Sequence, residues 1–418
     1  MAADARRSLE AVWRAEAPRL VGALTRLVRD VGLAEELAQD ALVAALEQWS
    51  RTGLPDNPGA WLMGTAKHRA IDLLRRGSLI AGKDADLAAE VERALVPDVD
   101  ARLDDAVGDD LLRLIFIACH PVLPPEGRAA LTLRLLGGLT TPEIARAFLV
   151  PEATVAQRIV RAKRTLAEAQ VPFEVPAGEA LVERLSSVLG VVYLLFNEGY
   201  SATVAEDLLR PALCDEALRL GHLLARLAPT EPEVHGLLAL MELQASRAAT
   251  RLDAQGGAVT LLEQDRARWD RAAIARGLSE LACAEALGGA LGPYALQAAI
   301  AACHARASAA AETDWGHIAA LYDVLAALTP SPVVELNRAV AHAMVFGPEA
   351  GLSMLEPLRR EPALARYHLL PTVRGDLLER LGRLDEARAE FELAAELVPT
   401  ARGKALLAER AKRVVSLG

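Results

Sequence analysis

Apolar residues recur at the three- and four-residue spacing of an amphipathic helix through most of the first 76 positions. The pattern predicts helices over 8–50 and 60–76, and the Gly-, Pro-, Asp- and Asn-rich stretch 51–59 predicts a loop between them. The apolar positions expected to face a core include Leu20, Leu24, Leu37, Ala41, Leu46, Leu62, Ala66, Ala70 and Leu73. The pattern then weakens into a polar, acidic linker over 77–110, and helices are expected to resume at Leu111.

Residues 139–166 are predicted to form two short helices with a tight break between them. Thr140 and Glu143 have the spacing of a capping box, in which each side chain bonds to the backbone N–H of the other residue. The break falls at Leu149–Val150, and Pro151 begins the second helix.

The second of these helices has two different faces. An apolar stripe is formed by Val155, Ile159, Ala162 and Leu166. Polar side chains point away from that stripe or lie on its flanks, namely Gln157, Arg158, Arg161, Lys163 and Arg164. A packed first helix followed by a second helix with a cationic outer face is typical of a helix-turn-helix.

The chain beyond the break at 171–178 is predicted to be helical to its end. A helical-hairpin repeat is clearest over 377–399, and a weaker copy covers 333–358. The positions that approximate a tetratricopeptide (TPR) repeat are Gly375, Leu378, Gly382, Ala387, Phe391, Ala394 and Pro399. Because such repeats bury their faces only by stacking, we expect residues 178–418 to form one TPR-like solenoid.

Composition supports an all-α fold. The chain has 418 residues, 52% of them hydrophobic but only 4% aromatic, and most of the apolar residues are Ala, Leu and Val. Its 4 cysteines exclude a disulfide scaffold, and no two have the CxxC spacing of a zinc site. No apolar run is long enough to span a membrane and the N-terminus has no signal-peptide core, so we expect a soluble, cytoplasmic protein.

The net charge of −10 is distributed unevenly. Residues 84–110 hold ten acidic residues and two arginines, whereas the rest of residues 1–170 has a net charge of +6. Two basic modules therefore flank an acidic strip. Trp61 begins the basic helix over 60–76, and its ring would offer a stacking surface to an unpaired base.

Catalytic motifs are scarce. There is no Walker A, GxGxxG, HExxH or GxSxG sequence, and we expect no catalytic residue, metal site or cofactor. The adjacent pairs Cys119-His120 and Cys303-His304 are most simply explained as buried helical cysteines beside hydrogen-bonded histidines.

The segments 27–49 and 61–76 resemble region two of bacterial sigma factors of the extracytoplasmic-function (ECF) type, and 139–166 resembles their region four. The order and separation of these segments match as well. Four stretches, PEATVAQRIVRAKR within the region-four segment and FNEGYSA, TDWGHIAALYD and SPVVELNRAVA after it, are similar to the subgroup with a long C-terminal TPR-like extension. The resemblance implies region two at 1–80, an acidic linker at 81–110, region four at 111–170 and a regulatory domain at 178–418.

The resemblance also implies partners. Contacts with the β′ clamp helices of core RNA polymerase fall on Glu35, Glu36, Gln39 and Asp40. Opening and reading of the −10 promoter element fall on Trp61, Lys67, His68, Arg69, Asp72, Arg75 and Arg76. Reading of the −35 element falls on Thr154, Gln157, Arg158, Arg161, Lys163 and Arg164, with the region-four scaffold on the β flap. The acidic linker would follow the positively charged RNA-exit path of the enzyme.

Two other classes of function stay open at this point. A transcriptional regulator with TPR-like repeats would bind DNA through 139–166 alone, and an interaction scaffold would use neither basic helix. The second basic helix favours a sigma factor, because a simple regulator has no use for a strand-opening module. The extension at 178–418 is expected to control the sigma module or to offer a surface to a protein or ligand partner.

Overall fold

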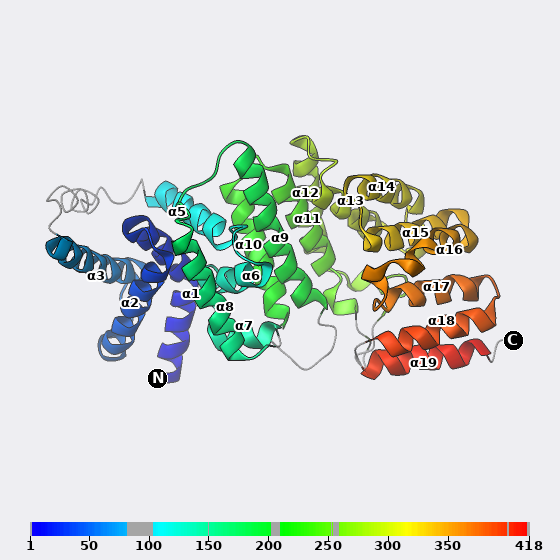
Figure 1. The fold of residues 1–418 in the computed structure, drawn as a ribbon, viewed down its shortest axis with the longest axis horizontal. Coiled ribbons are helices and arrows are strands. Elements are labelled where there is room, and N and C mark those ends of the chain that lie inside the picture. Colours follow the sequence, from blue (N-terminus) through cyan, green and yellow to red (C-terminus); the bar gives the residue numbers. More distant parts are fainter. Residues whose placement is uncertain are drawn as a thin grey trace. The chain divides into compact units, whose positions relative to one another are not determined.

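The computed structural model describes residues 2–81, 103–148, 150–201, 210–251, 253, 259–398 and 401–415 (Figure 1). Within these ranges the regular elements are all helices, so the predicted all-α class is confirmed. The chain divides into two compact units, Met1–Gly199 with Leu208–Leu227, and Tyr200–Asp207 with Ala228–Gly418. Among the described helices, none is long and apolar enough to cross a membrane.

The first unit begins with a three-helix module, α1 (Ala2–Val28), α2 (Val31–Thr52) and α3 (Pro58–Ala81), in which each helix packs on the other two. Asp30 caps α2 by accepting a hydrogen bond of 2.8 Å from the backbone N–H of Leu33. Gly53 ends the helix at a φ of +82°, which favours glycine. The two predicted helical regions and the loop between them are therefore confirmed, with α3 beginning at Pro58.

Two positions expected in the apolar stripes of this module lie outside its core. Leu46 on α2 and Leu73 on α3 are exposed, whereas Leu20, Leu24, Leu62 and the other predicted positions are buried. Ile71 takes the buried place expected for Leu73. The apolar stripes of α2 and α3 thus extend past the contact area that their neighbours cover.

The second module of the first unit consists of α5 (Leu103–Ala118), α6 (Pro125–Leu135), α7 (Thr141–Phe148) and α8 (Glu152–Glu168). Helix α5 begins at Leu103, eight residues before the predicted start at Leu111, so the end of the expected linker is helical. Residues 82–102 of that linker lie outside the described residues.

Helix α5 packs closely against α1 at Asp110. A Cβ on Gly22 of α1 would lie 3.1 Å from the carbonyl oxygen of Asp110, so the two helices approach closely. The Asp110 side chain is buried and pairs with Arg26 of α1 at 3.1 Å and with Arg113 at 2.9 Å. Asp110 therefore belongs to the interior of the unit and not to a solvated acidic strip.

Helices α9 (Glu179–Ser201) and α10 (Arg210–Leu227) also belong to the first unit. Arg184 donates to the carbonyl of Phe116 at 2.9 Å, and the Ser187 hydroxyl donates to the carbonyl of Cys119 at 2.5 Å. Arg128 donates to Ser187, and Arg219 on α10 donates to the carbonyl of Leu136 at 2.6 Å. The bonds from Arg184, Ser187 and Arg219 satisfy carbonyls at the ends of α5 and α6. Helices α9 and α10 therefore pack with the first unit, and the structure divides the chain after the predicted boundary at 178.

The second unit is a succession of helices, most of which pack on the next helix along the chain. Its α-helices are α11 (Pro232–Ala245), α12 (Arg271–Ala286), α13 (Pro293–Arg306), α14 (Trp315–Leu328), α15 (Pro332–Phe346), α16 (Pro348–Leu355), α17 (Leu369–Arg380), α18 (Leu384–Leu397) and α19 (Ala401–Val415). Short 3₁₀ turns lie between them at Ala248–Thr250, Arg266–Arg268, Ala310–Glu312, Pro357–Arg360 and Pro362–Leu364. Such nearest-neighbour packing is typical of helical repeats.

The hairpin of α17 and α18 shows why the predicted repeat positions have their residue types. A Cβ on Gly375 would lie only 2.6 Å from the ring of Phe391, which is fully buried, so a larger residue would push the helices apart. Gly382 turns the chain between the helices at a φ of +72°. Leu378 and Ala387 are buried in the same cluster, and the predicted Pro399 lies outside the described residues.

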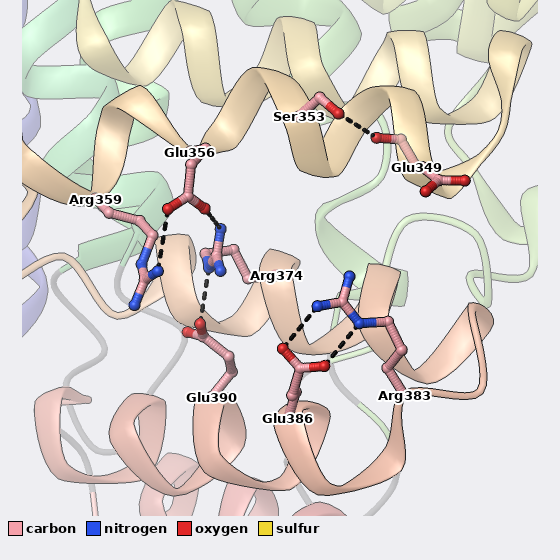
Figure 2. Close-up of polar contacts among 8 residues, drawn as sticks. All are labelled: Glu349, Ser353, Glu356, Arg359, Arg374, Arg383, Glu386 and Glu390. Carbon is pink, nitrogen blue, oxygen red and sulfur yellow. Dashed lines mark hydrogen bonds and ion pairs between the residues drawn. The ribbon is translucent and has the colours of Figure 1, made fainter.

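A buried arginine ties three elements of this unit together (Figure 2). Arg374 of α17 donates from Nε to Glu390 of α18 at 2.8 Å and from Nη1 to Glu356, at the start of the 3₁₀ turn, at 3.2 Å. Because Arg374 is buried, losing either acceptor would leave part of its charge unpaired. The neighbouring Arg383–Glu386 pair is exposed and contributes little to stability.

We expect Phe391→Ala to destabilise the second unit by about 3–5 kcal/mol, because the substitution leaves a cavity under Gly375. Urea unfolding followed by circular dichroism measures this change. The matched control is Phe346→Ala at the end of α15, where the ring is 66% exposed and the loss should stay within about 0.5 kcal/mol. Equal losses for the two variants would contradict this account of the hairpin.

Candidate nucleic-acid interface

The predicted helix-turn-helix is present as α7 and α8, which pack on each other and on α6. The capping box forms as expected, since the backbone N–H of Thr140 donates to Glu143 at 2.8 Å and that of Glu143 donates back at 3.4 Å. The predicted stripe of α8 is buried along its whole length, at Val155, Ile159, Ala162 and Leu166. The stripe fixes which face of α8 is turned outward.

The outer face of α8 carries most of the polar residues that the sequence assigned to DNA. Gln157, Arg161 and Arg164 are exposed, and Thr154 and Arg158 are half-buried at the edges of the helix. Arg164 pairs with Glu168 one turn later at 2.6 Å, but both side chains are well exposed, so the pair can exchange for another anion at little cost. This face can donate hydrogen bonds to acceptors outside the protein.

A second polar face lies on α3. His68, Arg69, Asp72 and Arg75 are exposed on it. The His68 ring lies 2.6 Å from the Gly64 carbonyl, and Arg69 pairs with Asp40 of α2 at 3.1 Å. Arg76 lies on the same helix, but its side chain is outside the described residues.

Lys67 and Trp61 face inward more than the other predicted α3 residues. Burial, together with the nearby charge of Arg26, lowers the pKa of Lys67 in spite of Asp110. The Trp61 ring packs edge-on against Trp49 of α2, with 5.2 Å between the ring centroids. Trp49 is buried, so Trp61 is half covered by the module's own core and only part of its ring could stack on a base.

The four residues assigned to polymerase binding differ in their surroundings. Glu36 and Asp40 are exposed on α2, whereas Glu35 is only 5% exposed. Gln39 is half-buried and donates from its amide to Glu35 at 2.6 Å. Glu35 is thus turned toward the interior of the unit, away from its exposed neighbours.

The Glu35 carboxylate joins the two modules of the first unit. Its Oε1 accepts from Arg134 of α6 at 2.6 Å, and its Oε2 lies 2.5 Å from the ammonium of Lys163 on α8. Burial alone would raise the pKa of Glu35, but the charges and hydrogen bonds of Lys163 and Arg134 outweigh it and leave the pKa below its ordinary value. Glu35 is therefore ionised at neutral pH and holds two cations from the other module.

Sequence reasoning assigned Glu35 and Lys163 to different partners and gave Arg134 no role. The structure brings these three side chains together, although Arg134 lies 99 residues from Glu35 along the chain. The signal that could have identified Arg134 is its position in the largely apolar segment 129–136, where a lone cation needs a buried partner.

No three His, Cys, Asp or Glu side chains within the described ranges gather as a metal-binding group. Burial, which outweighs the hydrogen bond to Thr132, raises the pKa of the Cys119 thiol to about 11. Burial also lowers the pKa of His120, next to Arg184, to about 4. The Cys119-His120 pair is therefore a neutral packing element.

Comparison with known families assigns both modules. Residues 12–79 match the family described as Sigma-70 region 2, and residues 113–166 match Sigma-70, region 4. Residues 184–285, from α9 to α12, match a family of unknown function, DUF6596. The polar faces of α3 and α8 thus lie one in each sigma-70 region.

The chain is similar to an uncharacterized protein over most of its length and to ECF sigma factors over its first part. An uncharacterized protein of Rhizobium meliloti is 46% identical over 389 residues, which cover 92% of this chain and 90% of that protein. The ECF RNA polymerase sigma factor SigK of Mycobacterium ulcerans is 31% identical over 153 residues, or 35% of this chain and 78% of SigK. This chain belongs to the ECF sigma factor family.

The match to a second ECF relative covers a smaller share of that relative. The probable ECF RNA polymerase sigma factor SigI of Mycobacterium tuberculosis is 29% identical over 178 residues, which are 42% of this chain and 60% of SigI. For this ECF family member, the resemblance seen in the sequence is confirmed in regions 2 and 4. The subgroup with a TPR-like extension stays a prediction.

We expect Glu35→Gln to destabilise the contact between regions 2 and 4 by about 3 kcal/mol, because it leaves Arg134 and Lys163 without their shared anion. Glu36→Gln, one residue away and exposed, should cost no more than about 0.5 kcal/mol. Urea unfolding of the three proteins at neutral pH measures the difference.

The same comparison across pH tests the charge of Glu35. Since the folded-state pKa is lowered, the stabilisation is fully present above the ordinary value of 4.5 and is lost as the pH falls through the lowered pKa. The gap between wild type and Glu35→Gln should therefore close toward acid. A gap that is constant from pH 7 to pH 3 would show that the carboxylate charge is not what stabilises the contact.

Proposed function

We propose that this protein is an ECF sigma factor that binds core RNA polymerase, recognises the −35 and −10 promoter elements and initiates transcription. In this role it performs no catalysis of its own. The observation that carries the proposal is the outer face of α8, where Gln157, Arg161 and Arg164 are exposed opposite a fully buried stripe. A second module with its own basic face, in region 2, supports it.

The −35 element is assigned to α8. Arg and Gln can form paired hydrogen bonds with base edges in the major groove, and the flanking cations neutralise phosphates. We assign Gln157, Arg161 and Arg164 to bases, with Thr154 and Arg158 at the edges of the helix. Lys163 can reach DNA only after it leaves Glu35.

The −10 element is assigned to α3, at His68, Arg69, Asp72, Arg75, Arg76 and Lys67, with Trp61 at the start of the helix. Core polymerase is assigned to Glu36, Gln39 and Asp40 on the exposed side of α2, and to Glu35 once its contact with region 4 opens. Because Arg69 pairs with Asp40, these two surfaces adjoin within region 2. The β′ clamp helices and the β flap are the proposed contacts on the enzyme.

Control by the C-terminal part is the finer element of the proposal. Helices α9 and α10 hydrogen-bond to the ends of α5 and α6 through Arg184, Ser187 and Arg219. Helices α9 and α10 therefore support the scaffold that holds α8. We propose that residues 228–418 form a TPR-like domain that regulates the sigma regions or binds a protein or ligand that does.

The alternatives are a helix-turn-helix regulator that does not bind core polymerase, and an interaction scaffold with TPR-like repeats. The regulator would leave the exposed face of α3 without a role. The interaction scaffold would leave both the exposed face of α3 and the outer face of α8 without a role. A net charge of −10 also fits a sigma factor better, because the polymerase supplies most phosphate contacts.

Run-off transcription with bacterial core polymerase and a promoter pool tests the proposal. We expect new start sites that share a −35 and a −10 element. Arg161→Ala should reduce initiation by roughly ten- to a hundredfold, the loss of one base contact. Arg388→Ala on α18 removes the same charge from an exposed site elsewhere and should leave initiation unchanged. An absence of start sites with folded wild-type protein would favour the alternatives.

A chain ending at Leu227 tests the proposed control, since it keeps α9 and α10 on region 4. We expect this truncated protein to use the same promoters at a level several-fold different from the full chain. Circular dichroism checks that it is folded. Equal levels with the full and the truncated chain would contradict control by residues 228–418, while leaving the sigma factor assignment intact.

A further inference from the structure

Val160 is the one large apolar side chain that α8, which is described in full, leaves exposed. Its exposed fraction is 64%, whereas the other β-branched aliphatic residues of the helix, Val155 and Ile159, are buried. A β-branched residue is a weaker helix former than the Ala, Gln and Arg residues around it. An exposed valine here therefore lowers helix stability without gaining burial in the folded chain.

The position of Val160 places it among the residues proposed to read bases. It lies three residues after Gln157, one before Arg161 and four before Arg164, so it shares their outer face. Ala156 and Ala153, both exposed, lie one and two turns before it along the helix. Since their side chains are short, a flat surface can approach the two Val160 methyl groups closely.

The major groove offers one apolar group to such a side chain, the 5-methyl group of thymine. Other base edges present hydrogen-bond donors and acceptors, and covering one of these with valine would leave it unsatisfied. In a helix the χ1 angle of valine has one strongly preferred rotamer, so its methyl groups are already held in place before DNA arrives. Valine therefore favours an A·T pair and disfavours a G·C pair at the base that it covers.

We infer that Val160 is a specificity-determining residue that contacts the methyl group of a thymine in the −35 element. The inference rests on the proposed function, because it needs α8 in the major groove. It adds a preference for an A·T pair at the base that Val160 covers, beside any preference that Gln157, Arg161 and Arg164 impose through their hydrogen bonds.

The test is a double-mutant cycle between protein and DNA. The full chain with core polymerase initiates from its best selected promoter, in which each thymine of the −35 element is replaced in turn by deoxyuridine. This replacement removes only the methyl group. Wild type and Val160→Ala are compared at every position, and Val182→Ala on α9, where the side chain is 71% exposed, is the matched control.

At one position, deoxyuridine should lower initiation by wild type about three- to fivefold, the factor for one buried methyl group. Val160→Ala should lose a similar factor on the thymine promoter and nothing more on the deoxyuridine promoter. Val182→Ala should respond as wild type does.

The inference would be overturned if, at every thymine, deoxyuridine lowered initiation by Val160→Ala as much as by wild type, or if the −35 element held no A·T pair. The sigma factor assignment would stand in both cases. An unchanged rate for Val160→Ala on the thymine promoter would likewise overturn the inference and leave that assignment standing. If wild type itself shows no dependence on a −35 element, the proposed function fails, and the inference fails with it.

Discussion

A buried carboxylate on α2 links the two sigma regions of this protein. Glu35 is withdrawn from water, and an isolated charge in that position would be strongly unfavourable. Arg134 and Lys163 make it tolerable by closing on its two oxygens at 2.6 and 2.5 Å. This contact ties α6 and α8 of region 4 to α2 of region 2, beside the packing of α5 on α1.

The same contact connects the two proposed interfaces. Glu35 belongs by resemblance to the surface for polymerase, and Lys163 belongs to the helix for DNA. While the two residues bind each other, neither is available to an outside partner. Glu36 and Asp40 on α2, and Gln157 and Arg161 on α8, stay exposed. The first encounter with polymerase or DNA can therefore use the exposed residues, and the buried pair can exchange afterwards.

Region 4 has a second attachment, to the helices that follow it in the chain. Side chains of α9 and α10 take up carbonyl groups at the ends of α5 and α6, where helical hydrogen bonding stops. Region 4 is thus bound on one side by region 2 and on another by α9 and α10. For that reason a domain boundary drawn at the polar stretch near 178 cuts through a packed unit.

The sequence alone determined the features that depend on neighbours a few residues apart. The buried stripe of α8, the Thr140–Glu143 capping box and the repeat positions around Phe391 all follow from helical spacing, which is local. The all-α class follows from the same periodicity.

Only the tertiary structure decided the role of residues whose partners lie far along the chain. Helical spacing places Glu35 nearer than Glu36 to the apolar stripe of α2, but it cannot show what Glu35 binds, because its partner Arg134 is 99 residues away. In the sequence Asp110 belongs to an acidic strip, whereas in the structure Arg26 of α1 lies beside it. Burial of a charge depends on which helices meet, and hydrophobic periodicity shows which face of a helix is covered but not which helix covers it.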